Sequence, residues 1–308
     1  MLKAIGADQA QAFQNAVREI LPILCFAPDA VEAFLTAYLP GSDGRSYVVE
    51  ADGGGPTFCR YSVDGSEVFV DYIIPSKWDD RYAQVRCAIE QLKDACLTPG
   101  SDRYIRMHVD ERLPSHAAYY LGLLPELGFT LKPRVTMTAP RDLTTRLIRP
   151  DLAEGVTEVS YHRDRLPAVI DVSVRAYSGK MLHELPEAEW DRLRQDEAPY
   201  LEGAFAQRRA ADTWTGLAFQ DRLVACSFGE VTDDRLKVEE VFVLPEFQGK
   251  GLGRHVTVRC LQKLHEQDGS PSKRFFLGTD RRWTPALNLY HSLGFSIDVV
   301  ESYALLHA

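Results

Sequence analysis

The sequence predicts a mixed α/β protein in which one fold, a mixed sheet flanked by helices, occurs twice in tandem. Three observations favour this fold class. Both halves pass through the same order of short strands and amphipathic helices, judged by the spacing of their apolar residues. The triplet Leu-Gly-Phe at 127–129 returns at 293–295, each time after a helical segment. Pro75 and Pro245 each end a strand rich in valine or isoleucine, and this spacing indicates an internal repeat.

The first half alternates strands and helices. Asp64-Gly65 is a tight-turn pair that joins two strands into a hairpin, and Val85, Ile89 and Leu92 form an apolar helical stripe. The expected elements are helices over Val31–Tyr38, Arg81–Leu97 and His116–Leu127, and strands over Tyr47–Val49, Thr57–Val63, Glu67–Ile74, Tyr104–Val109 and Thr130–Thr138.

The second half repeats this order, with two helices after its first strand. Pro199 should break or kink the second of these helices. The expected helices are Leu166–Tyr177, Pro186–Arg208, Gly251–Gln267 and Thr284–Leu293, and the expected strands are Gly155–Tyr161, Trp214–Phe219, Leu223–Phe228, Leu236–Leu244, Lys273–Gly278 and a final pair within Phe295–Leu306. Because the periodicity breaks near Pro140–Pro150, we expect domains at 1–140 and 151–308 with a linker at 141–150.

Composition excludes several classes of protein. The 308 residues are 45% hydrophobic, with 35 Lys+Arg against 44 Asp+Glu and a net charge of −9, so neither wholesale disorder nor a broad nucleic-acid-binding face is expected. No apolar run approaches the ~20 residues of a membrane span, and the first residues lack a signal-peptide core. The six cysteines and eight histidines show no metal-ligand spacing, which favours reduced thiols, a cytoplasmic location and no metal site.

The segment most informative about chemistry is a strand, ending at Leu244, that runs through a glycine-rich turn into a helix. Glycines allow backbone N–H groups to converge on an anion at the helix N-terminus, where the helix dipole, Lys250 and Arg254 add positive charge. The turn is neither a P-loop nor a dinucleotide fingerprint, because Arg254 stands where each pattern requires a different residue. It is therefore predicted to hold a diphosphate in another way.

The pattern Q-x-x-G-x-G at Gln248–Gly253, after a strand ending V-x-P, resembles the acyl-CoA-binding motif of the GNAT superfamily of N-acetyltransferases. Ala286–Phe295 is similar to the family's A-x-x-L-Y-x-x-x-G-F helix, although Trp283 replaces an asparagine that members often carry. The resemblance covers about Glu154–Ala308 and implies two tandem GNAT-like folds. In architecture alone, this resembles mycothiol synthase.

The resemblance implies an acyl donor, acetyl-CoA, and residues that hold it. In the family, backbone N–H groups of the splayed strand pair with the pantetheine arm and polarise the thioester carbonyl. The positions expected to bind the donor here are Val241, Phe242, Val243, Gln248, Gly249, Lys250, Gly251, Leu252, Gly253, Arg254 and Asn288.

Two catalytic residues are expected. A primary amine with a pKa near ~10 is mostly protonated at neutral pH, so a base must remove its proton. Glu239 and Glu240 both lie on the strand before the turn, and alternation favours Glu240, since Glu239 shares the parity of Val241. Tyr290 matches the family's general acid, which protonates the departing thiolate. A solvated or structural role for the glutamates, and plain core packing for Tyr290, are the alternatives.

The first half lacks this chemistry. Ser76–Tyr82 contains no glycine and has two acids where phosphates would lie, and Leu124 stands at the position of Tyr290. This copy is therefore predicted to be degenerate, and to buttress the second domain or wall the acceptor site.

The leading function is transfer of acetyl to a small-molecule amine, by a monomer or homodimer without nucleic-acid or membrane partners. Two alternatives stay open: a protein N-acetyltransferase, and a non-catalytic acyl-CoA-binding regulator. The aromatic residues near the expected acceptor site, with core packing as their alternative role, are Tyr177, Trp190, Tyr200 and Trp214. The histidines His255, His265 and His291 are expected on the surface.

Overall fold

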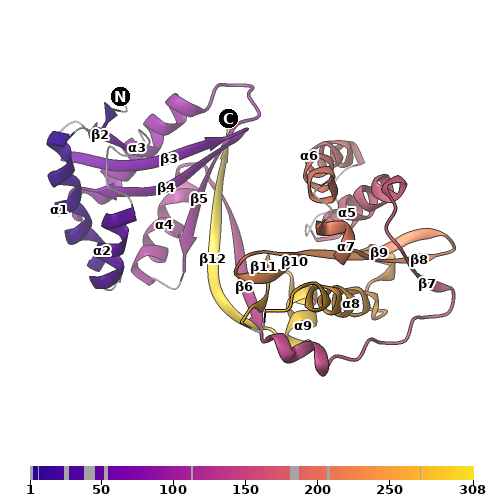
Figure 1. Cartoon of the computed structure of the whole chain (residues 1–308). Helices are drawn as coiled ribbons and strands as arrows, with labels where there is room; N and C mark the ends of the chain where they lie inside the picture. Colours follow the sequence, from indigo (N-terminus) through magenta and orange to yellow (C-terminus); the bar gives the residue numbers. More distant parts are fainter. Residues whose placement is uncertain are drawn as a thin grey trace. The chain divides into compact units, whose positions relative to one another are not determined.

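A computed structural model describes residues 3–5, 7–23, 28–37, 46–51, 55–111, 114–180, 187–206, 209–270 and 272–308. The chain divides into two compact units (Figure 1). The first unit comprises Met1–Arg134 together with Val299–Ala308, and the second comprises Val135–Asp298. Within the described ranges, no helix is both long and apolar enough to cross a lipid bilayer.

The first unit is a twisted sheet with helices on both faces. Its strands lie in the order β1-β2-β3-β4-β5-β12, of which only β4 and β5 run parallel among the registered pairs of described residues. Neighbouring residues of β4 enter different cores, since Ile73 packs with the cluster of α3 and α4 and Ile74 with that of α1 and α2. The elements are β1 (Lys3–Ala4), α1 (Ala7–Ile23), α2 (Pro28–Ala37), β2 (Ser46–Ala51), β3 (Gly55–Asp64), β4 (Glu67–Pro75), α3 (Arg81–Cys96), β5 (Tyr104–Asp110), α4 (Pro114–Glu126) and β12 (Ser296–His307).

The strands of the second unit have mixed directions and lie in the order β6-β11-β10-β9-β8-β7. β10 runs parallel to β11 and antiparallel to β9. Its elements are β6 (Thr130–Ala139), β7 (Val156–Val159), α5 (Leu166–Lys180), α6 (Glu187–Ala206), α7 (Arg209–Thr213), β8 (Thr215–Phe219), β9 (Arg222–Val231), β10 (Arg235–Val243), α8 (Leu252–Gln267), β11 (Arg274–Asp280) and α9 (Thr284–Ser292). The predicted mixed α/β fold class is confirmed.

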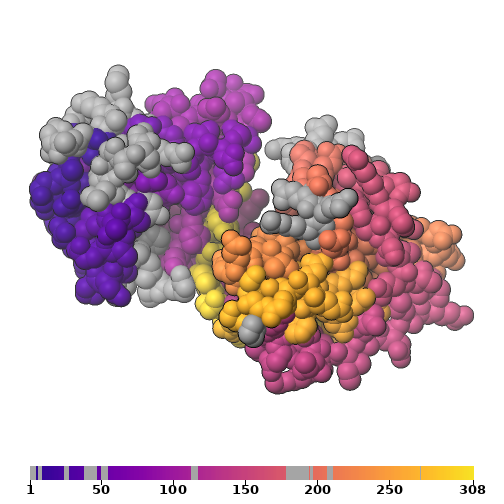
Figure 2. Space-filling model, in the orientation of Figure 1, coloured from indigo at the N-terminus to yellow at the C-terminus, as the bar shows by residue number. Residues whose placement is uncertain are grey.

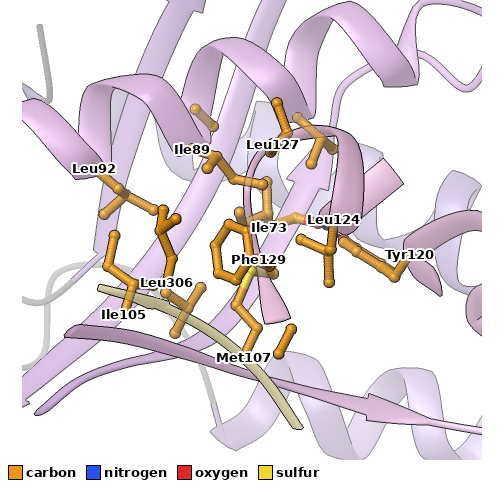
Figure 3. Packing of buried hydrophobic residues seen from close by; sticks show 14 of the residues in the cluster. Ile73, Ile89, Leu92, Ile105, Met107, Tyr120, Leu124, Leu127, Phe129 and Leu306 are labelled. Carbon is orange, nitrogen blue, oxygen red and sulfur yellow. Dashed lines mark hydrogen bonds between the residues drawn. The ribbon is translucent and has the colours of Figure 1, made fainter. Parts of the chain in front are cut away.

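The last strand of each repeat belongs to the sheet of the other repeat. β12, at the end of the second half, pairs with β5 from Glu301↔Asp110 to His307↔Tyr104, and β6, at the end of the first half, lies beside β11. Leu306 of β12 accordingly packs with Ile105 in the core of the first unit (Figure 3). The expected pair of strands within Phe295–Leu306 was wrong, because this segment is the single strand β12.

The two units therefore do not divide where the periodicity breaks. Residues 135–140 and the expected linker 141–150 group with the second unit, and Val299–Ala308 groups with the first. Arg141 donates to the carbonyl oxygens of His265, in the last turn of α8, and of Asp268, just after it, and pairs with the Asp268 carboxylate at 2.9 Å. The segment is thus anchored to α8 instead of hanging free between domains.

Two further expectations differ from the structure. α1 was not predicted, although its apolar residues Phe13, Val17 and Ile20 are buried. α6 continues through Pro199, so the helix does not break there. β1 and α7 were not predicted either. The other helices and strands lie close to the expected positions, and the segment 181–186 at the start of the expected helix Pro186–Arg208 lies outside the described residues.

Candidate functional site

The site of the predicted chemistry is built on β10, which separates from its parallel neighbour. Within the described part of the chain, β10 pairs with β11 only over Arg235–Lys237 against Arg274–Phe276. Its pairing with β9 continues on the other side to Val243↔Ala225. The far half of β10 therefore exposes one main-chain edge to the opening between the two parallel strands.

Two hydrogen bonds show which main-chain groups point into this opening. The Leu244 N–H donates to the Val224 carbonyl of β9 at 2.9 Å. Because main-chain groups alternate in direction along a strand, those of Val241 and Val243 point away from β9. In agreement, the Gln248 side-chain amide donates to the Val243 carbonyl at 3.2 Å. These two residues therefore supply the N–H donors on the open edge.

The turn after β10 owes its path to its glycines. After a short 3-10 helix at Pro245–Phe247, Gly249 and Gly251 adopt φ of 75° and 79°, and Gly251 is the N-cap of α8. A Cβ at Gly249 would meet no atom within 4 Å, and at Gly251 the nearest atom would be Pro150 Cγ at 3.9 Å. The backbone conformation, and not crowding, thus requires glycine here, and the space in front of the turn stays open.

The start of α8 lies against both β10 and α9. A Cβ at Gly253 would lie 3.4 Å from Val243 Cγ2 and 3.5 Å from Leu289 Cδ2. The side chains of Phe242 and Leu252 are buried at 0% and 2% exposure. Leu252 can therefore offer a ligand mainly its main chain, whereas the main-chain groups of Phe242 point toward β9, so the structure does not place Phe242 on the open edge.

The charge at this helix N-terminus is positive. The first turn of α8 carries no acidic residue, so the helix dipole is not offset there. The Lys250 ammonium lies 4.9 Å from the Phe247 ring centre. The Arg254 guanidinium bonds Ser292 Oγ at 2.9 Å and thereby ties the start of α8 to the end of α9. Both helices contribute to the surface drawn in orange and yellow in Figure 2.

Tyr290 lies on the inner face of α9. It is 7% exposed and meets Phe295 edge to face, with ring centres 6.1 Å apart. Burial raises the pKa of Tyr290 above its ordinary value of 10, and the negative charge of Glu240 raises it further. Tyr290 thus stays protonated through neutral pH. Asn288, two residues earlier, is exposed.

The strand alternation used to choose between the glutamates fails at a β-bulge. The β9 register shifts between Val238 and Glu240, so Glu239 is the extra residue. Glu240 accepts a hydrogen bond from the Tyr177 hydroxyl of α5 at 3.0 Å. The negative charge of Glu240 also raises the pKa of Tyr290 on α9. The direction of the Glu240 side chain thus depends on the bulge and not on simple alternation, and its catalytic role stays a prediction.

Glu239 has different neighbours. Its carboxylate pairs with Lys237 at 2.6 Å, and the hydroxyl of Tyr200 on α6 lies 3.5 Å from it. Desolvation raises the pKa of Glu239 against the opposing effect of Lys237. Of the other expected acceptor-site aromatics, Trp214 is a core residue at 1% exposure, and the Trp190 side chain lies outside the described residues.

Sequence reasoning misplaced His255. It was expected on the surface, but it is 6% exposed, with Nδ1 2.9 Å from the Pro150 carbonyl oxygen and Nε2 3.5 Å from Glu158. Its place one turn after Leu252, on the apolar stripe of α8, was the signal that could have revealed its burial. Within the described ranges, no cluster of three histidine, cysteine or acidic residues could hold a metal ion.

The equivalent region of the first unit is filled by its own side chains. β4 pairs with β5 only to Val70↔Met107, and its bulge at Asp71 matches that at Glu239. The Tyr120 hydroxyl of α4 bonds the Ile73 carbonyl at 2.9 Å, on the edge that corresponds to Val241. By the same register, Tyr72 takes the position of Glu240.

In the turn that follows β4, side chains of the same unit also take up the polar groups. The Gln84 side chain, fully buried, accepts the Ser76 N–H at 2.8 Å. Arg81 stacks on Trp78 at 4.2 Å and bonds its carbonyl at 2.7 Å. Leu124, at the position of Tyr290, is fully buried. This geometry supports the prediction that the first copy is degenerate.

Comparisons with known proteins agree with this description. Residues 179–295 match the sequence profile described as the acetyltransferase (GNAT) family. A segment of 96 residues, 30% of the chain, is 35% identical to mycothiol acetyltransferase of Rothia mucilaginosa (strain DY-18). The match covers 25% of that relative's length.

Solved structures share the fold over nearly the whole chain. A GCN5-related N-acetyltransferase from Sphaerobacter thermophilus superposes with a TM-score of 0.57 at 16% identity, covering 99% of this chain and 95% of the other. A tandem GNAT protein from the clavulanic acid biosynthesis pathway gives 0.52 at 15% identity, covering 99% and 97%. At these identities the likeness concerns the fold alone.

Proposed function

We propose that the protein is an acyl-CoA-dependent N-acyltransferase, because residues 179–295 match the acetyltransferase (GNAT) family. The donor is acetyl-CoA, and the acceptor is a primary amine of a small molecule. One observation supports the proposal most: β10 carries both a free main-chain edge and Glu240, and it runs into the glycine turn at α8. In this proposal, the acyl donor, a base and an acid therefore meet at one site.

The donor is held mainly by main-chain groups. The N–H groups of Val241 and Val243 face the opening and bind the pantetheine arm, and the turn from Gln248 to Gly253 holds the diphosphate. The φ values of Gly249 and Gly251 and the open space in front of them fit such an anion. The Lys250 side chain adds charge, whereas Arg254 already bonds Ser292 and positions α9. Acetyl-CoA supplies the activated acyl group.

The transfer is direct. Glu240 accepts the proton of the acceptor amine, whose nitrogen then attacks the thioester carbonyl, and fixed N–H dipoles on β10 stabilise the negative charge that develops on oxygen. Tyr290 donates its proton to the departing thiolate. The phenol regains a proton from the attacking nitrogen, which loses its second proton as the amide forms, and Glu240 releases its proton to solvent. Burial raises the pKa of Cys260 to about 12, which disfavours a covalent cysteine intermediate.

The experiment is a CoA-release assay with acetyl-CoA and a broad panel of amines. Gly251→Asp places a carboxylate where the diphosphate is expected, so its KM for acetyl-CoA should rise by about tenfold or more. Gly251→Asn is the matched control, because it has the same size at the same positive φ but no charge.

Three results would contradict the proposal. Equal CoA release by the parent and by Gly251→Asp would remove the turn from the donor site. Donor binding without release from any amine would favour a regulatory binding protein. Release only with peptide or protein amines would replace the small-molecule acceptor.

A further inference from the structure

α5 brings the phenol of Tyr177, which is partly buried, to the carboxylate of Glu240. The Tyr177 hydroxyl donates to Glu240 Oε2 at 3.0 Å, and its ring meets Phe242 edge to face, with ring centres 5.7 Å apart. The pKa of Tyr177 is raised well above 10 by burial first, and then by the charges of Glu240 and Glu197. The hydroxyl therefore remains a hydrogen-bond donor wherever Glu240 is ionised.

The neighbouring glutamate is held in another way. Glu239 pairs with Lys237 at 2.6 Å, and the Tyr200 hydroxyl lies 3.5 Å from it, at the limit of a hydrogen bond. Tyr200 is 44% exposed. Each of two adjacent carboxylates thus lies beside a tyrosine hydroxyl. The contact to Glu240 is short and partly buried, and the contact to Glu239 is long and exposed.

We propose that Tyr177 is the positioning residue of the reaction, because it fixes the Glu240 carboxylate for proton removal from the acceptor amine. This inference rests on the proposed function. A glutamate side chain has three rotatable bonds, and a donor on one oxygen fixes the plane of the carboxylate and the direction of its second oxygen. The packing of the ring on Phe242 fixes the donor in turn.

The same bond favours the charged form of Glu240, since a donor to a carboxylate opposes its protonation. The other titratable groups that the Glu240 charge affects are Tyr200 on α6, Cys226 on β9 and Tyr290 on α9. The pKa of each is raised, so none of them loses a proton between pH 4 and 8. The acidic groups near Tyr177 and Tyr200 are Glu197 and Glu239.

The test is Tyr177→Phe, which removes the hydroxyl and keeps the ring against Phe242. We expect kcat to fall about tenfold, the KM for acetyl-CoA to stay within about twofold, and the acidic limb of the kcat/KM profile to move to higher pH. Tyr200→Phe is the matched control, and Glu239→Gln tests the second carboxylate. Both should leave the acidic limb in place.

A double-mutant cycle shows whether Tyr177 acts through Glu240. In a Glu240→Gln background, Tyr177→Phe should lower kcat no further. The loss of Tm in the double variant should be smaller than the sum of the losses in the two single variants. Unchanged kinetics and acidic limb in a folded Tyr177→Phe would overturn the proposal, as would additive losses. The Tm cycle needs no turnover, so it tests the contact even if no amine releases CoA, which would instead refute the proposed function.

Discussion

In the first unit β4 leaves β5 after Val70, and in the second unit β10 leaves β11 after Lys237. Both openings follow a three- or four-residue parallel pairing, and both strands carry a bulge just beyond it. In the first unit Tyr120 bonds the strand edge. In the second, the helix position that corresponds to Tyr120 is Ala286, which has no group to reach that edge. The backbone makes the opening, and the side chains decide whether a ligand can use it.

The turns after β4 and β10 differ in the same way, in whether their main-chain donors are satisfied within the chain. In the first unit a buried glutamine oxygen accepts the N–H of Ser76, so an internal acceptor takes a role that an anion could fill. In the second unit, Gly249 and Gly251 give the turn its path and leave open space in front of it. An anion-binding turn is thus lost when its donors are satisfied within the chain.

The largest effect should come from the two residues that have no chemical counterpart in the first unit. Glu240→Gln should lower kcat by about 10²-fold or more, and Tyr290→Phe by about tenfold or more, because each removes a proton-transfer group. Steady-state kinetics with a responsive amine, and calorimetry for donor affinity, provide the check. Full turnover in either variant would remove that residue from the mechanism.

The hydrogen bond between Tyr120 and Ile73 in the first unit should affect the stability of the fold and not donor binding. Tyr120→Phe leaves the buried Ile73 carbonyl without the phenol, which should lower the free energy of unfolding by about 1–3 kcal/mol. The KM for acetyl-CoA should not change. Urea unfolding beside kinetics measures both quantities, and a changed KM would show that the first unit takes part in donor binding.

A smaller difference should be visible at alkaline pH. The pKa of Tyr290 is raised above 10 by burial and by Glu240, so its folded-state pKa exceeds that of the unfolded chain. Its contribution to stability is complete below about pH 10 and is lost as the pH rises through the folded-state pKa. The Tm of the parent should therefore fall more steeply above pH 10 than that of Tyr290→Phe. Parallel curves would mean that Tyr290 is not buried in this way.

Local patterns in the sequence were sufficient for most of the second unit. Periodicity located α8 and β10, and glycine spacing located the turn, because both depend on residues close together in the chain. The exchange of β6 and β12 could not be predicted, since the apolar residues of a strand show that it is buried but not which strand it pairs with.

The site was less predictable than the fold. The bulge at Glu239 interrupts the alternation that parity arguments need. Tyr177 lies on an apolar helix stripe, where a core residue and a donor to Glu240 have the same sequence pattern. His255 was missed for the same reason, because its partners Pro150 and Glu158 come from distant segments. Tertiary packing, and not local pattern, determines these contacts.

The central claim is that the turn at Gln248–Gly253 binds the diphosphate of acetyl-CoA and that the first unit has no equivalent site. Isothermal titration calorimetry of the full chain with acetyl-CoA tests it most directly. We predict one binding event per chain, retained by Gly251→Asn and weakened about tenfold or more by Gly251→Asp. No heat of binding, two equivalent sites, or undiminished affinity in Gly251→Asp would contradict the claim.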